Sequence, residues 1–170
     1  MKIALVWGSS TGNTENAAEQ IKGQLGVDFA ISGSIAEVDV ASLVGCDVII
    51  VGCSTWNTGE MQEDWNDPFE AMGGLNFAGS RLAVFGCGDQ SGYAANYVDG
   101  MATIYARFIE RGASGGYGFT STSGYEFEES LADVGEGQFC GLALDEENQG
   151  DQTEARVTAW CAQLKSELGL

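Results

Sequence analysis

The chain has 170 residues, a length typical of one domain, so we expect a single domain over residues 1–170. Seven Lys and Arg against 25 Asp and Glu give a net charge of −18, which disfavours nucleic acid and anionic membranes as ligands and favours basic protein partners. The chain has no histidine, which argues against triad hydrolysis and most zinc chemistry.

Cysteine usage and hydropathy bear on the compartment. The five cysteines are widely spaced and contain no C-x-x-C pair, so they do not indicate zinc or an iron–sulfur cluster. We expect these cysteines to act as small apolar residues, in a protein from a reducing compartment. The N-terminal apolar run is too short for a signal peptide, and no segment reaches transmembrane length. We therefore expect a cytoplasmic protein without membrane insertion.

Apolar runs and helical stripes alternate along the chain. Successive apolar residues at 2–7, 47–52 and 81–86 predict buried parallel strands, with weaker strands at 27–32 and 141–144. Two amphipathic helices are indicated by apolar stripes at Ala17, Ile21 and Leu25, and at Met101, Ile104, Tyr105, Phe108 and Ile109.

The last helix has the clearest pattern. Asp151 and Glu154 have the spacing of a capping box. The expected buried face of this helix consists of Val157, Trp160, Cys161, Leu164 and Leu168. A weaker helix is expected at 63–72.

This alternation predicts an α/β fold, a doubly wound parallel sheet with helices on both faces and ligands beyond the carboxyl ends of its strands. Residues 117–139 have no sustained period, which is uncommon for a plain loop. We expect an insertion that splits the last strand into two pieces, at 114–118 and 139–144.

The first loop, Ser9-Ser10-Thr11-Gly12-Asn13-Thr14, lies at a strand-to-helix turn. The free N–H groups and the positive dipole end of the helix favour an anion there, and the hydroxyls add donors. It contains no lysine or arginine and matches neither the P-loop nor the dinucleotide glycine pattern. It predicts a neutral seat for a mononucleotide-type phosphate. An ordinary helix N-cap by Thr11 or Asn13 is the alternative.

Two aromatic residues lie in loops after later strands. Trp56 and Tyr93 are surrounded there by small and polar residues. Beside a phosphate loop they indicate a planar heterocycle held by stacking, each contact contributing about 0.5–1.5 kcal/mol beyond area burial. The alternative is that each ring anchors its loop on the sheet edge. Gly59 and Gly88 let the backbone approach a ring or adopt a positive φ, although each also suits a simple tight turn.

In these motifs the chain resembles the long-chain flavodoxins, over nearly all of its length. The resemblance also includes Gly124-Tyr125-Glu126-Phe127 and Gly141-Leu142-Ala143-Leu144-Asp145. It implies a flavodoxin-like fold with a five-stranded parallel sheet in the order 2-1-3-4-5, and non-covalently bound FMN.

The resemblance also implies a role for individual residues. The FMN phosphate would be held by Ser9, Thr11, Asn13, Thr14, Thr55 and the amides of Ser10 and Gly12. Trp56 would cover the inner ring face and Tyr93 the outer one. The pyrimidine edge would be read by backbone groups of Gly59, Cys87, Gly88, Asp89, Asn96 and Val98. Asp145 would reach the ribityl hydroxyls, and the Asn57–Thr58 peptide would reorient when the flavin takes a proton at N5.

The function expected on this basis is low-potential one-electron transfer, not enzymatic catalysis. A fully reduced, anionic flavin beside a phosphate dianion is disfavoured in a protein of charge −18, whereas a neutral semiquinone is not. We therefore expect cycling between semiquinone and hydroquinone, by a monomer.

Docking of redox partners is expected on an acidic segment. No basic residue occurs between residues 23 and 80, and Glu60, Glu63, Asp64 and Asp67 lie close to Trp56 in the sequence. A solvated acidic face without a docking role is the alternative. The resemblance implies basic reductases such as ferredoxin–NADP reductase as donors, and photosystem I or nitrogenase reductase as acceptors.

Two other functions share the cofactor or the topology of this expected electron carrier. An FMN-dependent NAD(P)H:quinone oxidoreductase needs a substrate pocket over the flavin, where Tyr93 is expected. A phosphoacceptor signalling module shares the topology, but it needs paired acids after the first strand and an aspartate after the third. Ser9-Ser10 and Cys53 stand at those positions.

Overall fold

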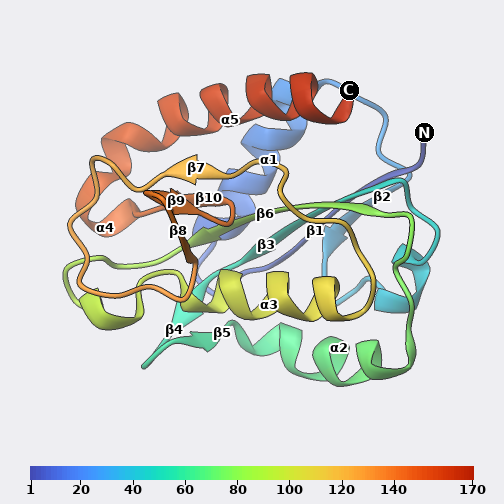
Figure 1. Cartoon of the computed structure of the whole chain (residues 1–170), viewed down its shortest axis with the longest axis horizontal. Helices are drawn as coiled ribbons and strands as arrows, with labels where there is room; N and C mark the ends of the chain where they lie inside the picture. Colours follow the sequence, from blue (N-terminus) through green and yellow to red (C-terminus); the bar gives the residue numbers. More distant parts are fainter.

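A central parallel sheet organises the computed structural model, which describes residues 1–170 (Figure 1). Its strand order is β2-β1-β3-β6-β10. Counted among the five sheet strands alone, this is the predicted order 2-1-3-4-5, so the fold class is confirmed. The strands are β1 (Ile3–Gly8), β2 (Ile31–Ser34), β3 (Val48–Cys53), β6 (Arg81–Cys87) and β10 (Leu142–Leu144).

The inner strands are apolar because helices cover both faces of the sheet. Every residue of β1 and β3 is buried, as the unbroken apolar runs predict. The second strand begins later than the predicted 27–32, because pairing with β1 starts at Ala30, whose N–H donates to the Ile3 carbonyl. Val27 and Phe29 instead pack, partly buried, on the hydrophobic cluster beneath the first and last helices.

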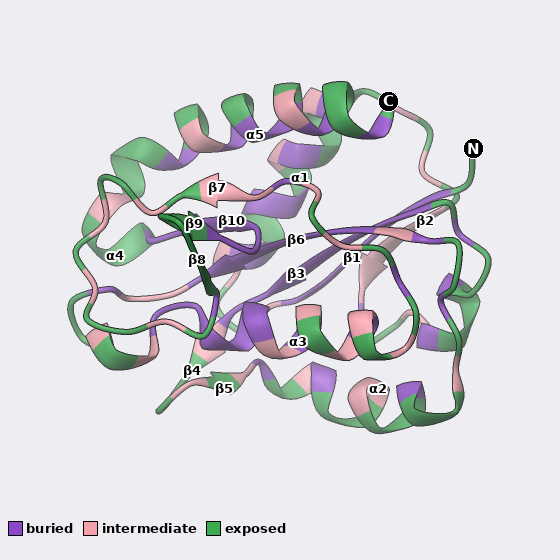
Figure 2. Cartoon of the chain, viewed as in Figure 1, coloured by how far each residue is buried: buried purple, intermediate pink, exposed green.

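Helices α1 (Asn13–Leu25) and α5 (Thr153–Leu168) cover one face of the sheet, and α3 (Asp99–Glu110) and α2 (Asn66–Ala71) lie on the other (Figure 1). Figure 2 shows the buried stripes of α1 and α5 turned towards the sheet. The predicted core positions of α1 and α5 are all buried. In α3, Tyr105 and Ile109 are only partly buried. No helix combines the length and apolar character needed to cross a membrane.

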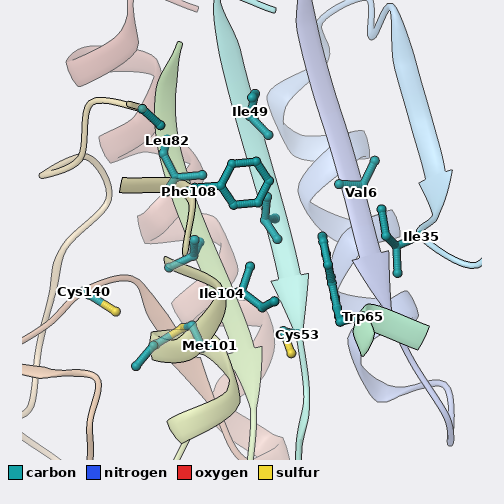
Figure 3. Packing of buried hydrophobic residues seen from close by; sticks show 14 of the residues in the cluster. Val6, Ile35, Ile49, Cys53, Trp65, Leu82, Met101, Ile104, Phe108 and Cys140 are labelled. Atoms are coloured by element: carbon teal, nitrogen blue, oxygen red, sulfur yellow. The ribbon is translucent and has the colours of Figure 1, made fainter. Parts of the chain in front are cut away.

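The core on the α3 face is tightly interlocked. Phe108 points from α3 onto β3 and β6, while Trp65 packs near Val6 and Ile35 (Figure 3). The Phe77 and Phe108 rings lie 4.8 Å apart. All five cysteines are free and buried, so they behave as the small apolar residues that the sequence predicts.

The predicted 63–72 helix is divided into three turns: η2 (Glu63–Trp65), α2, and η3 (Met72–Gly74). The predicted capping box of α5 is wrong. Asp151 lies inside a short helical turn, η5 (Gly150–Gln152), and no side chain caps α5. The cap belongs to the preceding helix, α4 (Glu146–Gln149), where Asp145 accepts from the N–H of Asn148.

Residues 117–139 form an insertion with a small antiparallel sheet of its own, in the order β7-β9-β8. Its strands are β7 (Thr120–Ser121), β8 (Asp133–Gly135) and β9 (Gln138–Phe139). The fifth strand of the main sheet is split as predicted, since Ser114 bridges Arg81 at one end of β6 while β10 pairs with the other end. The second piece is shorter than the predicted 139–144, because Phe139 pairs with Thr120 in the sheet of the insertion. The first piece is a single bridge, not a strand, because Gly116 and Gly118 adopt positive φ.

Candidate functional site

The loops at the carboxyl ends of β1, β3 and β6 meet the start of α4 around a cavity of about 380 Å³. This convergence follows from the parallel sheet, whose strands all end at one edge. The structure brings together most of the predicted site residues, which lie up to 84 positions apart. Those that line this cavity are Ser9, Thr11, Asn13, Thr14, Thr55, Trp56, Asn57, Cys87, Gly88, Asp89 and Tyr93.

The loop after β1 presents hydrogen-bond donors with no internal partner. Gly12 is the N-cap residue of α1, with φ of 93°, and no side chain caps the helix. The interpretation of Thr11 or Asn13 as an ordinary N-cap is therefore wrong. Ser9 Oγ accepts from the Gly12 N–H at 3.2 Å, and the buried Thr14 Oγ1 has no hydrogen-bond partner. Uncapped amides and an unpaired buried hydroxyl fit an anionic group such as phosphate.

The cavity is lined by no basic residue. Burial raises the pKa of the Cys87 thiol to about 12. The thiol is thus neutral and adds no charge. An anion in this cavity would be held by neutral hydroxyls, the Asn13 amide and main-chain N–H groups.

Two exposed aromatic rings border the same cavity. Trp56 is 38% exposed and Tyr93 is 49% exposed, unlike the other, buried tryptophans. The Trp56 indole N–H donates to Ser54 Oγ at 3.0 Å, which fixes the ring within the hairpin of β4 (Thr55–Trp56) and β5 (Glu60–Met61). Because both rings leave a large area uncovered, the alternative that they anchor loops on the sheet edge does not fit.

The tip of this hairpin has an unusual backbone. Asn57 and Gly59 both adopt positive φ, of 49° and 88°. A Cβ on Gly59 would come within 2.7 Å of Asp99 Oδ2, so glycine is required there. Val98, the N-cap of α3, has φ of 51°, which is strained for a β-branched residue. Gly88 has an ordinary φ, and its lack of a side chain instead permits close packing with Tyr97 and Val98.

Several predicted residues do not line the cavity. Ser10 and Gly59 line a neighbouring hollow of about 690 Å³, and Trp56 and Asn57 stand between the two. Thr58 is exposed at the hairpin tip. Gly12 contributes only backbone. The Val98 side chain is fully buried and the Asn96 amide donates to Asp99 Oδ2 at 3.4 Å, so main-chain groups are what these two residues can offer.

Asp145 does not fit the expected contact with sugar hydroxyls. It is fully buried, and its Oδ2 accepts from Gln90 N at 3.0 Å, Gln90 Nε2 at 2.8 Å and Asn148 Nδ2 at 2.9 Å. Its Oδ1 accepts the Asn148 N–H at 3.0 Å. The carboxylate therefore joins β10, the Tyr93 loop and α4, and its oxygens are already occupied.

The cavity also includes residues that the sequence did not single out, namely Ser54, Glu146 and Glu147. Ser54 directly precedes the predicted segment 55–59 and positions Trp56. Glu146 and Glu147 follow the last strand, so the rule that ligands bind beyond strand ends would have found them.

The fold and the site together define a class of protein: an open α/β protein with a neutral anion seat beneath two exposed aromatic rings, suited to a mononucleotide with a planar ring. Comparisons with known proteins identify the family. Residues 5–160 match the family model described as flavodoxin. A Nostoc flavodoxin is 42% identical over 169 residues, covering 99% of this chain and 98% of the relative.

Other relatives agree. Flavodoxin 1 of Salmonella typhimurium is 42% identical over 166 residues, covering 98% of this chain and 94% of the relative. The solved flavodoxin of Fusobacterium nucleatum bound to flavin mononucleotide matches with a TM-score of 0.87 and 27% identity, covering 98% of each chain. The chain belongs to the flavodoxin family. It is accordingly an electron-transfer protein, not an enzyme, and the signalling alternative is wrong.

Proposed function

We propose that this chain binds FMN non-covalently in the 380 Å³ cavity and carries single electrons between redox proteins. The observation that carries the proposal is the uncapped loop with its unpaired Thr14 hydroxyl, set beneath two exposed aromatic rings. When bound, FMN supplies a redox centre that accepts and releases electrons one at a time.

The phosphate would be held by the side chains of Ser9, Thr11, Asn13 and Thr14. Ser9 Oγ accepts a hydrogen bond from Gly12, so its own proton is free to donate to an anion. Thr55 Oγ1 likewise accepts from the Gly100 N–H at 2.8 Å and can donate its proton. The Ser10 amide adds a donor, whereas the Gly12 amide would have to exchange its present partner.

The flavin ring would lie between Trp56 and Tyr93, with its pyrimidine edge on main-chain groups of Gly59, Cys87, Gly88, Asp89, Asn96 and Val98. Positive φ at Asn57 and Gly59 places the intervening peptide at an exposed turn, where it can rotate without disturbing the core. After rotation the Asn57 carbonyl can accept a hydrogen bond from a proton on ring atom N5.

The electrostatics of this edge favour giving electrons away. No lysine or arginine lines the cavity, and Glu146 and Glu147 lie on its wall. With FMN bound, its phosphate and these carboxylates would oppose added negative charge without a compensating cation, which would lower the reduction potential.

A titration tests the proposed function. Apoprotein mixed with FMN should lose tryptophan fluorescence to a 1:1 end point. Stepwise reduction of the yellow complex should resolve two one-electron steps in the visible spectrum, and NADH alone should not be oxidised. A protein that takes up no FMN, or that accepts both electrons in one step, would contradict the proposal.

Basic redox proteins are the proposed partners, with ferredoxin–NADP reductase as a candidate donor and photosystem I or nitrogenase reductase as candidate acceptors. Glu60, Glu63 and Asp67 are exposed. The first two line the hollow beside Trp56, whereas Asp67 lines a second groove together with Glu63 and Asp64. Asp64 is half-buried and hydrogen-bonded to Gln62, so it offers less to a partner. The buried free cysteines suit a reducing compartment such as the cytoplasm.

Charge reversal tests this docking surface. Glu63→Lys should slow electron transfer to a basic reductase at low salt and flatten its salt dependence. Asp28→Lys is the matched control, because this exposed residue precedes β2 at the opposite edge of the sheet. Equal effects of both changes would show that only net charge matters.

A further inference from the structure

Gln62 is a buried polar residue that lies outside the cavity, at the start of η2. Its side chain is 1% exposed, and its amide uses every group it has. Oε1 accepts from the Asp64 N–H at 3.1 Å, and Nε2 donates to Asp64 Oδ2 at 2.8 Å and to Ser10 Oγ at 3.2 Å. A fully paired buried amide has one stable orientation.

This amide joins two segments that have separate proposed roles. Ser10 belongs to the loop that would hold the phosphate, and Asp64 belongs to the acidic segment beside Trp56. Within residues 9–14 the side chains make two hydrogen bonds, one inside the loop between Ser9 and Gly12, the other between Ser10 and Gln62. The Gln62 amide is therefore the only side-chain tether from this loop to another part of the chain.

The seat of the amide is rigid. A Cβ on Gly8 would lie 2.2 Å from Gln62 Oε1 and 2.7 Å from Trp65 Cδ1, so the last residue of β1 must be glycine to admit both side chains. Trp65 is fully buried and donates from its indole N–H to the Gly52 carbonyl at 3.1 Å. The main chain of Gln62 is held in turn by the Ser54 carbonyl, at 3.0 Å.

The hydrogen bond from Gln62 reaches the loop of residues 9–14 on the side that faces away from the cavity. Ser10 lines the 690 Å³ hollow together with Glu60 and Glu63, whereas Ser9, Thr11 and Thr14 line the inner cavity. The Ser10 hydroxyl thus points away from the anion seat. Holding it from outside fixes the direction of the Ser10 peptide, whose N–H is a proposed phosphate donor.

We propose that Gln62 is a positioning residue that holds the Ser10 amide towards the phosphate and couples anion binding to the acidic segment at Asp64. This inference rests on the proposed function, because the phosphate is that of FMN. It assigns the tether an effect on the phosphate alone and none on the ring.

The test compares FMN with riboflavin, which has the same ring and no phosphate. Removing the tether by Ser10→Ala should weaken FMN binding to apoprotein by about two- to tenfold, the effect of one hydrogen bond, and leave riboflavin binding unchanged. Ser10→Thr keeps the hydroxyl and should restore the ratio of the two dissociation constants. Gln62→Leu should change the ratio as Ser10→Ala does, and combining the two should add nothing.

A second readout follows the coupling itself. Hydrogen exchange at the Asp64 amide should slow when inorganic phosphate binds wild-type apoprotein, and should not respond in Ser10→Ala. Because Ser10 is exposed, this variant folds even where Gln62→Leu does not.

Three results would decide against the inference. A ratio of the two dissociation constants that Ser10→Ala leaves unchanged, whether both constants stay the same or both rise equally, would reduce the tether to a structural contact. Exchange at Asp64 that responds alike in both proteins would remove the coupling. Wild-type protein that binds riboflavin as tightly as FMN would instead refute the proposed phosphate seat, and the inference with it.

Discussion

Replacing Asp145 by asparagine separates a structural carboxylate from a ligand of the cofactor. The two side chains have the same shape, but asparagine has no charge and only one acceptor oxygen. Three donors meet at Oδ2 and one at Oδ1, so the least costly orientation keeps the oxygen at Oδ2 and turns the amide towards the Asn148 N–H. That orientation removes the cap of α4, which costs about 1 kcal/mol.

The remaining three hydrogen bonds lose their charged acceptor. Bonds to charged groups contribute about 1.5–3 kcal/mol each and neutral ones about 0.5–1.5, so the three bonds together lose about 3–4 kcal/mol. With the lost cap included, we expect Asp145→Asn to destabilise the apoprotein by about 4–5 kcal/mol. Urea unfolding of apoprotein measures this, with a midpoint lower by about 2–2.5 M at an m-value of about 2 kcal/mol/M. Asp28→Asn, at an exposed site, is the control.

The opposite pattern would refute this reasoning. If Asp145→Asn left the unfolding midpoint unchanged but weakened FMN binding, the carboxylate would be a direct ligand, as the family resemblance implies. The hydrogen bonds of Asp145 with Gln90 and Asn148 would then contribute little to stability.

Four further substitutions test the site and its support. Trp56→Leu and Tyr93→Leu should each raise the dissociation constant for FMN by about tenfold or more, through lost stacking and area, as measured by fluorescence titration; an unchanged constant would remove that ring from the site. Gly8→Ala should prevent folding or lower the melting temperature steeply, because its Cβ meets Gln62 and Trp65 at 2.2 and 2.7 Å, whereas Gly23→Ala, in open space on α1, should not. Hydrogen bonds, the strongest from the Gly92 N–H, lower the pKa of the Asp89 carboxyl in the folded protein below its ordinary value of 3.8. The ionised carboxylate therefore stabilises the fold fully above pH 3.8, and this stabilisation is lost as the pH falls through the lower pKa of the folded state. Melting curves between about pH 2 and 5 should therefore be less pH-dependent in Asp89→Asn than in wild type.

The sequence predicted the sheet and its helices because these depend on local periodicity. Runs such as 48–53 are apolar without interruption, and the stripe of α5 from Val157 to Leu168 repeats at helical spacing. Boundaries were less predictable. Asp151 and Glu154 match a capping box, but the chain forms a short turn there, because Thr153 bonds to Glu146 across it and Asp145 caps the preceding helix.

The site was predictable where it depends on strand ends, and not where it depends on partners distant in sequence. Thr14, Trp56 and Tyr93 follow β1, β3 and β6, which are neighbours in the sheet, so parallel topology alone brings them together. Nothing in the local pattern shows that four donors converge on Asp145. Nor does it show that Gln62 joins the loop after β1 to the segment at Asp64. Those roles arise from contacts 52 to 55 residues apart, which become visible only in the folded chain.

The seven basic residues complete the electrostatic account by their place in the fold. Lys2 and Arg81 stand at the amino ends of β1 and β6, and Lys22, Arg107 and Lys165 lie in the last turns of α1, α3 and α5. Because these helices run antiparallel to the strands, all five lie towards the edge opposite the cavity (Figure 1).

Of the other two cations, Arg111 follows α3 at that same edge, and Arg156 stacks on the Tyr125 ring, 4.0 Å from its centroid. A six-residue strand spans about 20 Å, more than twice the screening length of about 8 Å at physiological salt, so exposed cations at one edge barely offset charge at the other. Arg156, in the first turn of α5, is therefore the one cation towards the cavity end, and it is engaged with the Tyr125 ring and with Gln149 Oε1 at 2.7 Å. The excess of acidic residues at this end disfavours added negative charge, which agrees with the proposed release of electrons there to a basic partner.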